Sequence, residues 1–329
     1  MNSTFKNIIT DFFSLIPLET LHKMVTHHLV LPFYHSITDH PGAHIRNLEY
    51  YRSIKHFQTD IDFFKRHYKP LSISELSLSQ KEKGFFISFD DGLSELYFNA
   101  IPYLIEKKLS AALFINSDFV DNKSMFYRHK VSLILEELKT NSNSGKVADY
   151  LNITTENIKT TIQKTEYYES SRLDDIAEIL GLSFRQYLDF HKPYLSSSQI
   201  IEIQSNGFTI GNHSKDHPNF KTINFEEQKR QIETASSYLK NNFNTSPLYF
   251  AFPFGDDQIK NELFHYIFKE ANFELSFGVS GLKSDDFKKH LHRIPMETGD
   301  LSAMEIMKLQ CFKYLIRKMT GSNQIKRAN

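Results

Sequence analysis

Tryptophan is absent from this sequence of 329 residues, and cysteine occurs once, as Cys311. A single cysteine excludes an intramolecular disulfide, which favours a reducing compartment, although many exported proteins also lack disulfides. No apolar run reaches the roughly 18 residues of a membrane-spanning helix. Basic and acidic residues number 39 each, so the formal net charge is zero, and nothing indicates a nucleic acid partner. The 29 phenylalanines and 16 tyrosines must supply the aromatic packing.

The beginning of the chain, MNSTFKNIITDFFSLIP, is not typical of a signal peptide. Its charged region is weak, Asp11 interrupts the apolar stretch, and no small-residue cleavage site follows. Apolar residues from Phe5 to Ile16 recur at helical spacing before Pro17, so we predict an amphipathic helical segment within residues 1–28. We therefore expect a cytoplasmic protein, with possible peripheral contact to a membrane through its terminal helices.

Short apolar runs recur along residues 29–300 and alternate with helix-like stretches. Several runs are apolar on both faces, as expected for parallel strands covered by helices. The runs are LVLPFY (29–34), FFISF (85–89), AALFIN (111–116), FTIGN (208–212), LYFAF (248–252), ELSFGV (274–279) and HRIPM (292–296). The helix candidates are residues 50–64, 94–105, 225–243 and 259–271. This alternation predicts an α/β fold, and about seven strands favour a barrel or a strongly curved sheet.

Two segments fall outside this alternation. Residues 123–195 are polar and helix-forming without a strand signal, so we predict a helical insertion between two strands of the barrel domain. Residues 301–329 contain an amphipathic helix, 304–319, with four basic side chains. Such a helix either lies on an anionic membrane or packs across the end of the barrel with its charges exposed. We expect the final residues, NQIKRAN, to be disordered.

Two adjacent carboxylates, Asp90 and Asp91, follow the run FFISF and precede Gly92. Active sites of α/β barrels are built at the carboxyl ends of strands. Two carboxylates there are costly unless a cation or hydrogen bonds compensate them. Because adjacent strand residues point in different directions, one can bind a metal while the other faces a substrate. The alternative is a turn with both aspartates solvated.

Two histidines, His213 and His217, follow the run FTIGN. With three residues between them, both can meet one metal where the backbone turns helically. Chance pairs are expected among 15 histidines, but the position at a predicted strand end strengthens this pair. Two imidazoles and one carboxylate form a common ligand set of catalytic zinc, which leaves room for water and substrate.

Two further motifs follow later strands. In FPFG (252–255), Pro253 and Gly255 force a turn around Phe254, whose backbone could face a developing oxyanion and whose ring could wall a sugar-sized groove. A plain corner between strand and loop is the alternative. The motif HLHRIP (290–295) supplies two candidate acids and one cation. Its alternative is a surface cluster with the neighbouring lysines.

The order of these motifs resembles the polysaccharide deacetylase family, the nodulation-type deacetylases. The resemblance rests on SFDDG (88–92), HSKDH (213–217), FAFPFG (250–255) and a final RIP strand, in this order. The stretches LPFYHSI and TIGNHSKDHPNF are also similar to that family. The resemblance covers roughly residues 29–300, apart from the insertion. It implies a distorted (β/α) barrel, usually of seven strands, in agreement with the strand count.

The resemblance also implies a role for each site residue. Asp91, His213 and His217 would hold one divalent metal, most often Zn²⁺. Asp90 would be the general base that activates the metal-bound water for attack on the acetamide carbonyl carbon. The backbone N–H of Phe254 would help to hold the oxyanion. Metal and amide would then stabilise charge that develops only in the transition state.

This sequence departs from the family's pattern at two positions. Many members have a histidine acid in a Leu-x-His motif near the end of the domain, whereas Leu291 and His292 are adjacent here. His292 is our candidate for the general acid. Many members also have an arginine at the position of Ala251 that pairs with the base. We hypothesise that Arg293, from the last strand, contacts Asp90 instead.

Tyr34 and His35 end the first predicted strand and are candidates for substrate binding. The leading hypothesis is hydrolytic removal of an N-acetyl group from an amino sugar in a glycan or a lipid-linked sugar, in cell-surface polysaccharide metabolism. Deformylation or O-deacetylation of a related sugar would use the same site. A catalytically silent carbohydrate-binding protein on the same fold is the alternative from another class, against which the intact aspartates and histidines argue.

Overall fold

The computed structural model describes residues 16–26, 29–48, 51–77 and 83–328. Most of the amphipathic helix predicted for the beginning of the chain lies outside these residues. The first described helix, α2, comprises Leu18–Met24 and follows Pro17.

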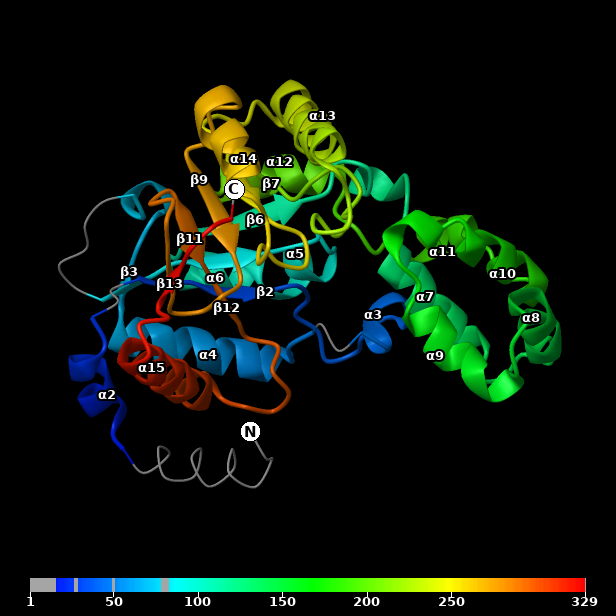
Figure 1. Cartoon of the computed structure of the whole chain (residues 1–329), viewed down its shortest axis with the longest axis horizontal. Coiled ribbons are helices and arrows are strands. Elements are labelled where there is room, and N and C mark those ends of the chain that lie inside the picture. Colours follow the sequence, from blue (N-terminus) through cyan, green and yellow to red (C-terminus); the bar gives the residue numbers. More distant parts are fainter. Residues whose placement is uncertain (1–15, 27–28, 49–50, 78–82, 329) are drawn as a thin grey trace.

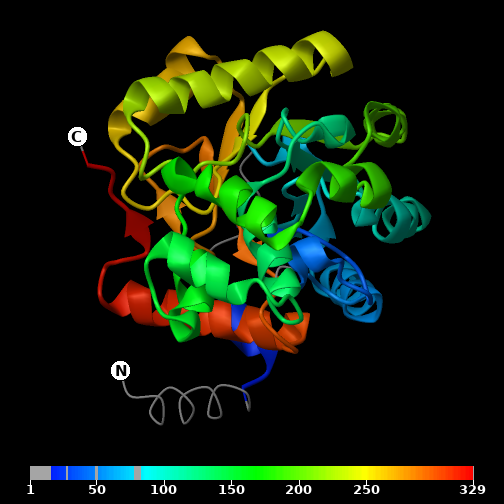
Figure 2. The same cartoon turned by 90° about the vertical axis from the view of Figure 1, so that its right-hand side faces the viewer.

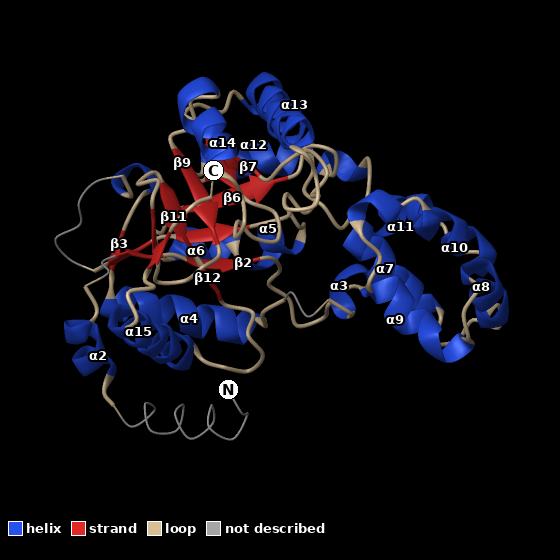
Figure 3. Ribbon diagram, in the orientation of Figure 1, coloured by secondary structure: helices blue, strands red, loops and turns tan. Residues whose placement is uncertain are grey.

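The central sheet is built from parallel strands that follow the predicted apolar runs (Figure 3). They are β2 (Pro32–Tyr34), β5 (Ile87–Phe89), β6 (Ala111–Ile115), β7 (Thr209–Asn212), β8 (Tyr249–Ala251), β9 (Leu275–Gly278), β11 (His290–His292) and β12 (Ile294–Pro295). β11 and β12 are consecutive parts of one extended segment. β11 pairs with β9 and β12 pairs with β2, so this segment closes the sheet. The predicted barrel of seven strand positions is therefore confirmed.

Side chains alternate between the inside and the outside of this barrel. Along β6, Ala112 and Phe114 belong to the apolar cluster inside the barrel. Ala111, Leu113 and Ile115 belong to the cluster between the strands and the surrounding helices. Every residue of β6 is buried. A strand with both faces buried needs apolar residues at successive positions, which explains the continuous runs in the sequence.

Helices surround the barrel on its outer face (Figure 1). They are α4 (Ile54–His67), α5 (Glu95–Asn99), α6 (Ile101–Glu106), α12 (Ser197–Ser205), α13 (Phe225–Phe243), α14 (Asn261–His265) and α15 (Ala303–Met319), whereas α3 (Ala43–Arg46) packs against α7 of the insertion described below. The predicted helix 94–105 is two helices that meet at Ala100, and Pro102 lies in the first turn of the second, where a missing N–H costs nothing. The predicted helix 259–271 is α14 followed by the π-helical turn η5 (Tyr266–Glu270).

Smaller elements complete the described chain. A three-stranded parallel sheet joins β1 (Leu29–Val30), β4 (Gly84–Phe85) and β3 (Lys69–Pro70), and a two-stranded sheet joins β10 (Ser284–Asp285) and β13 (Gln324–Ile325). The short 3₁₀ turns are η1 (Ile73–Glu75), η2 (Val120–Asn122), η3 (Thr155–Asn157) and η4 (Tyr167–Glu169).

Five helices of the predicted insertion project from one side of the barrel in Figure 1 and face the viewer in Figure 2. They are α7 (Tyr127–Glu137), α8 (Ser144–Leu151), α9 (Ile158–Gln163), α10 (Arg172–Leu180) and α11 (Phe184–His191). Their apolar sides form a core of their own, in which Ile134, Val147 and Leu173 are buried. Leu93 and Phe119 from the barrel loops join this core, so it attaches the insertion at the edge where active sites of barrels form.

The C-terminal helix α15 packs against α2 and α4, and its residues Ile306, Met307 and Cys311 are buried in the main core. This agrees with packing across the barrel. The disorder expected for the final residues is wrong for 323–328, because β13 pairs with β10 and Arg327 is buried against two carboxylates. Within the described part of the chain, no helix combines the length and apolar character needed to cross a membrane.

Candidate active site

A pocket opens at the carboxyl ends of the barrel strands and contains most of the chemistry predicted from the sequence. Its cavity of about 240 Å³ far exceeds the roughly 30 Å³ that one water molecule takes in the liquid. It therefore has room for a substrate group. The pocket is lined by Phe33, His35, Asp90, Asp91, Phe126, His213, His217, Phe252, Phe254, Val279, Pro295 and Glu297.

Three of these side chains converge on one point. Asp91 Oδ1 lies 3.1 Å from His217 Nε2 and 3.4 Å from His213 Nε2, and the two Nε2 atoms are 3.1 Å apart. Asp91 follows β5, and the two histidines follow β7. The three residues are buried. Burial alone would raise the pKa of Asp91, but its electrostatic interaction with His217, together with the closeness of His213, holds it well below the usual value.

The loops that carry these residues adopt conformations that are rare outside glycine. Asp91, Ser214 and His217 have φ values of 68°, 73° and 62°. Each such residue costs of order 1–3 kcal/mol, and strain of this kind concentrates at functional sites. Gly92 also has a positive φ, and a Cβ there would approach Ile115 to 2.9 Å. The backbone is thus bent to direct these side chains toward one point.

Hydrogen bonds fix the loop that contains His213 and His217. The Asn212 side chain accepts from the Ser214 N–H (2.7 Å), and Ser214 Oγ accepts from the His217 N–H (3.1 Å). His213 Nδ1 lies 2.9 Å from the carbonyl oxygen of Ala251, to which only a protonated nitrogen can donate. Nε2 of His213 is therefore left with its lone pair, directed at Asp91 and His217.

These three residues fit a divalent metal. Asp91 Oδ1 is buried and accepts no hydrogen bond from the described part of the chain, although it lies between two imidazoles. The two Nε2 atoms lie 3.1 Å apart, and two lone pairs that face each other at this distance cannot both find a partner. A cation between the three atoms satisfies all of them, and two histidines with one carboxylate leave coordination positions for water and substrate.

Asp90 lies beside this triad and is held by Arg293. The guanidinium donates to both carboxylate oxygens, from Nη1 to Oδ1 (2.6 Å) and from Nη2 to Oδ2 (2.7 Å). Both side chains are almost fully buried. Burial would raise the pKa of Asp90, but the charge and the hydrogen bonds of Arg293 lower the pKa below its usual value. Asp90 is therefore ionised at neutral pH, and Arg293 makes the contact expected from the sequence.

His35 faces the same pocket and is paired with Glu297. Its Nδ1 lies 2.5 Å from Glu297 Oε2, and its backbone N–H donates to Oε1 (2.6 Å). Burial lowers the pKa of His35, but the charge and hydrogen bond of Glu297, with smaller contributions from Asp91 and Asp90, raise it to about 9. His35 therefore carries a proton at neutral pH, opposite the ionised Asp90.

The turn after β8 forms another wall of the pocket. Phe254 has a φ of 58°, and the Gly255 N–H donates to the Pro253 carbonyl (2.6 Å) across it. Within the described residues, no acceptor takes the Phe254 N–H. The Phe254 ring is 41% exposed and contacts the ring of His217, with centroids 4.9 Å apart. The turn thus presents an amide and an aromatic face beside the triad.

The structure places several predicted site residues away from the pocket. His292 is buried beside Asp285, with Nε2 3.2 Å from Oδ2, so its ring is engaged in another cluster. Tyr34 is fully buried, and its hydroxyl donates to Asp60 (3.3 Å) on the outer side of the barrel. Neither lines the pocket, because neighbouring strand residues alternate between inside and outside. Pro253 lies in the turn that carries Phe254, and Arg293 binds Asp90 without lining the pocket itself.

Glu297 and Phe126 are among the pocket residues that the sequence analysis did not identify. Glu297 directly follows the last predicted strand, so the strand-end rule that identified Asp90 would have found it. Phe126 precedes α7, and its ring lies 4.3 Å from that of His217. The insertion also contacts the histidine loop through the Tyr167 hydroxyl, which donates to Asp216 (3.0 Å). No local pattern could have identified Phe126.

The polysaccharide deacetylase family model matches residues 78–275. Among solved structures, the fold is similar to that of the deacetylase PplD from Streptococcus pyogenes, with a TM-score of 0.54 and 14% identity over 85% of this chain and 96% of that one. IcaB from Ammonifex degensii gives 0.54 and 16%, over 87% and 97%. A de-N-acetylase from Aggregatibacter actinomycetemcomitans gives 0.53 and 14%, over 85% and 99%. No curated protein sequence matches this chain.

Proposed function

The chain belongs to the polysaccharide deacetylase family, and we propose that it hydrolyses the N-acetyl group of an amino sugar, in a glycan or a lipid-linked saccharide, with the help of one divalent metal. The observation that carries this proposal is the convergence of Asp91, His213 and His217 beside an ionised Asp90. Zinc is the metal that best suits two imidazoles and one carboxylate.

The choice of an N-acetyl group rests on chemistry and on similarity. One of the similar structures is described as a de-N-acetylase, which favours an amide over an ester substrate. Hydrolysis of an amide releases an amine, and the leaving nitrogen must receive a proton from a donor. Protonated His35 can provide this proton. Deformylation and O-deacetylation of a related sugar remain the alternatives within the same site.

Asp90 takes the proton from the attacking water in this mechanism. When bound, the metal supplies a Lewis acid that polarises the acetamide carbonyl and makes a water molecule more acidic. Arg293 fixes both oxygens of Asp90, so the carboxylate is held in one orientation toward the triad. The Phe254 N–H donates to the oxyanion, a contact that gains strength only as charge develops on that oxygen.

His35 donates the proton to the leaving amine, the role that the sequence analysis had given to His292. Glu297 holds the imidazole by its Nδ1, and the ring lines the pocket. The base and the acid thus have environments that shift their pKa values in opposite directions, with Asp90 lowered and His35 raised. Such a separated pair is typical of enzymes that need an acid and a base at the same pH.

Acetate release from N-acetylated glycans in the presence of zinc tests the proposal. We expect activity in the wild type and a loss of about 10²–10⁴-fold in Asp90→Asn, the usual contribution of a general base. Asp62→Asn is the matched control, because Asp62 is half-exposed on α4. If wild type and Asp90→Asn both bind N-acetylated glycans without releasing acetate, the chain is a silent carbohydrate-binding protein.

Cytoplasmic location and peripheral membrane contact stay predictions from the sequence. Flotation with anionic liposomes tests the second. Met304, Ile316 and Met319 of α15 are exposed and would carry such a contact. Replacing Met319 and Ile316 with serine should abolish flotation if α15 lies on the bilayer.

A further inference from the structure

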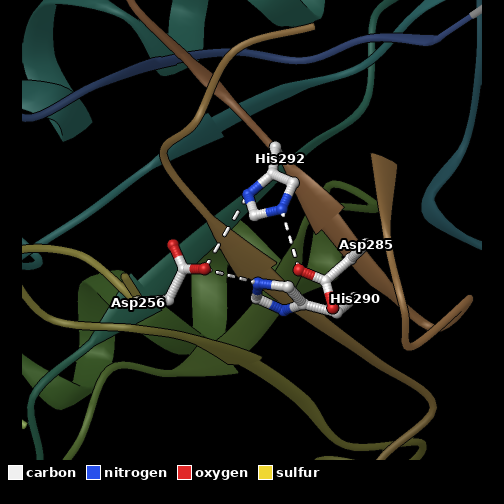
Figure 4. Close-up of side chains that lie close together, drawn as sticks. All are labelled: Asp256, Asp285, His290 and His292. Atoms are coloured by element: carbon white, nitrogen blue, oxygen red, sulfur yellow. Dashed lines mark hydrogen bonds and ion pairs between the residues drawn. The ribbon is translucent and has the colours of Figure 1, made fainter. Parts of the chain in front are cut away.

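A second cluster of buried ionisable side chains lies outside the pocket. Figure 4 shows Asp256, Asp285, His290 and His292 directed toward one another. His290 Nε2 lies 3.0 Å from Asp256 Oδ2, and His292 Nε2 lies 3.2 Å from Asp285 Oδ2. The four side chains have no solvent exposure. The cluster contains both histidines of the HLHRIP motif, for which the proposed function has no use.

Arg327, which lies far along the chain from most of the cluster, reaches into it. Its Nη2 donates to Oδ2 of both Asp256 and Asp285, and its Nη1 donates to the backbone carbonyl of Asp256. The guanidinium also stacks on the ring of Phe264, at 4.5 Å from the centroid. The strand pair β10–β13 and a hydrogen bond from the Asn261 N–H to the Ala328 carbonyl (2.9 Å) hold the segment around it.

Both carboxylates of the cluster are held by this one guanidinium. Burial would raise the pKa of both carboxyls, but hydrogen bonds from the histidines and from Arg327 outweigh it. The pKa of Asp285 is about 2, and that of Asp256 lies further below its usual value. A divalent metal would need the same carboxylate oxygens that Arg327 occupies, and it would lie beside a fixed positive charge. The geometry therefore favours Arg327 as the cation of this cluster.

Asp256 connects the cluster to the pocket. It follows Gly255 at the end of the turn that carries the Phe254 amide. Its Oδ1 accepts from the N–H of Val279 (3.2 Å), another pocket residue. Gly278 permits this approach, because a Cβ there would come within 2.1 Å of Asp256 Oδ1. Asp256 thus accepts a hydrogen bond from Arg327 through Oδ2. Through Oδ1 it fixes Val279, and through its place in the chain it fixes the turn that carries Phe254.

We propose that Arg327 is a positioning residue for the reaction: by binding Asp256 and Asp285, it holds the turn 253–256 so that the Phe254 amide meets the oxyanion. This proposal rests on the proposed deacetylase function. Arg327 does not touch the substrate, and its effect passes through Asp256. The final described segment of the chain therefore belongs to the machinery of the site, although it lies behind the pocket.

The test compares Arg327→Gln and Arg327→Lys with Lys326→Gln, which removes the neighbouring, less buried cation. Loss of one oxyanion donor lowers kcat by about 10²–10³-fold. We expect Arg327→Gln to lower kcat by roughly 10²-fold with KM changed less than about threefold, because the amide acts only in the transition state. Arg327→Lys should recover part of this loss, and Lys326→Gln should match the wild type. A rise in KM with unchanged kcat would overturn the proposal.

Hydrogen–deuterium exchange provides a readout that does not depend on activity or on uniform destabilisation. In Arg327→Gln, amides of residues 254–257 and 279 should exchange faster, while those of β5 and β6 keep the wild-type rate. Equal acceleration throughout the barrel, or no change in the turn, would refute the positioning role. If the wild type releases no acetate, the proposed function fails, and exchange in the turn still decides the inference. Binding of two zinc ions per chain, one of them lost in His290→Ala, would show a metal site instead.

Discussion

Replacing Arg293 with methionine should uncouple Asp90 from its charge partner while keeping most of the packing. The guanidinium lies 4.4 Å from the ring centroid of Phe33 and donates to both oxygens of Asp90 at 2.6 and 2.7 Å. Methionine has a similar length and fills the same apolar space. The variant leaves a carboxylate with a 3% exposed side chain and without its guanidinium partner. Breaking a buried pair in this way costs about 3–5 kcal/mol.

The loss of stability should depend on pH in a defined direction. In the wild type, Arg293 lowers the pKa of Asp90 despite burial, so the pair stabilises the fold above the unfolded pKa of ~3.9. That stabilisation is lost as pH falls through the lower folded value. In Arg293→Met, burial is unopposed by Arg293 and moves the pKa upward. The ionised carboxyl then destabilises the fold at neutral pH, and this penalty disappears once the carboxyl is protonated.

Urea unfolding of the metal-free wild type and variant at pH 7.5 and pH 4.5 measures this difference. We expect the gap in unfolding free energy to be largest at pH 7.5 and clearly smaller at pH 4.5. The rise of kcat/KM with pH should also move to higher pH, because it reports the ionisation of the base. Arg317→Met is the control, since Arg317 donates to the Ser280 carbonyl and meets no carboxylate among the residues that the structure describes. An equal gap at both pH values would refute the reasoning.

Three further predictions concern the pocket. Glu297→Gln removes the charge that raises the pKa of His35 to about 9. The fall of kcat at high pH should therefore begin at a lower pH, and a pH profile of kcat that does not move would exclude His35 as the acid. His213→Ala should lose the metal and at least ~10²-fold of activity, measured by metal analysis and acetate release, and full metal content in this variant would contradict the ligand assignment. Phe254→Ala keeps the backbone amide but loses a 41% exposed ring, so KM should rise by about 3–10-fold at nearly constant kcat, whereas Phe98→Ala on α5 should change neither.

The strands and the first residues after them were determined by local sequence. Parallel strands with two covered faces need continuous apolar runs, and such runs marked all seven strand positions. The carboxyl ends of parallel strands meet at one edge, so Asp90, Asp91, His213 and His217 were found from their places directly after apolar runs. This reasoning needs no knowledge of distant contacts, which is why it succeeded for residues that follow strands directly.

The contacts between site residues that are distant in sequence depend on closure of the barrel. Arg293 and Asp90 are 203 positions apart, and they meet because the segment 290–295 pairs with both β9 and β2. The alternation of side chains along β11 directed His292 into the Asp285 cluster and away from the pocket, and our proposed proton donor is therefore His35, directly after β2. Arg327 ordered a segment expected to be disordered, because two buried carboxylates need a cation that local composition does not reveal. The sequence by itself determined which residues could do chemistry, and the tertiary structure decided which of them face one another.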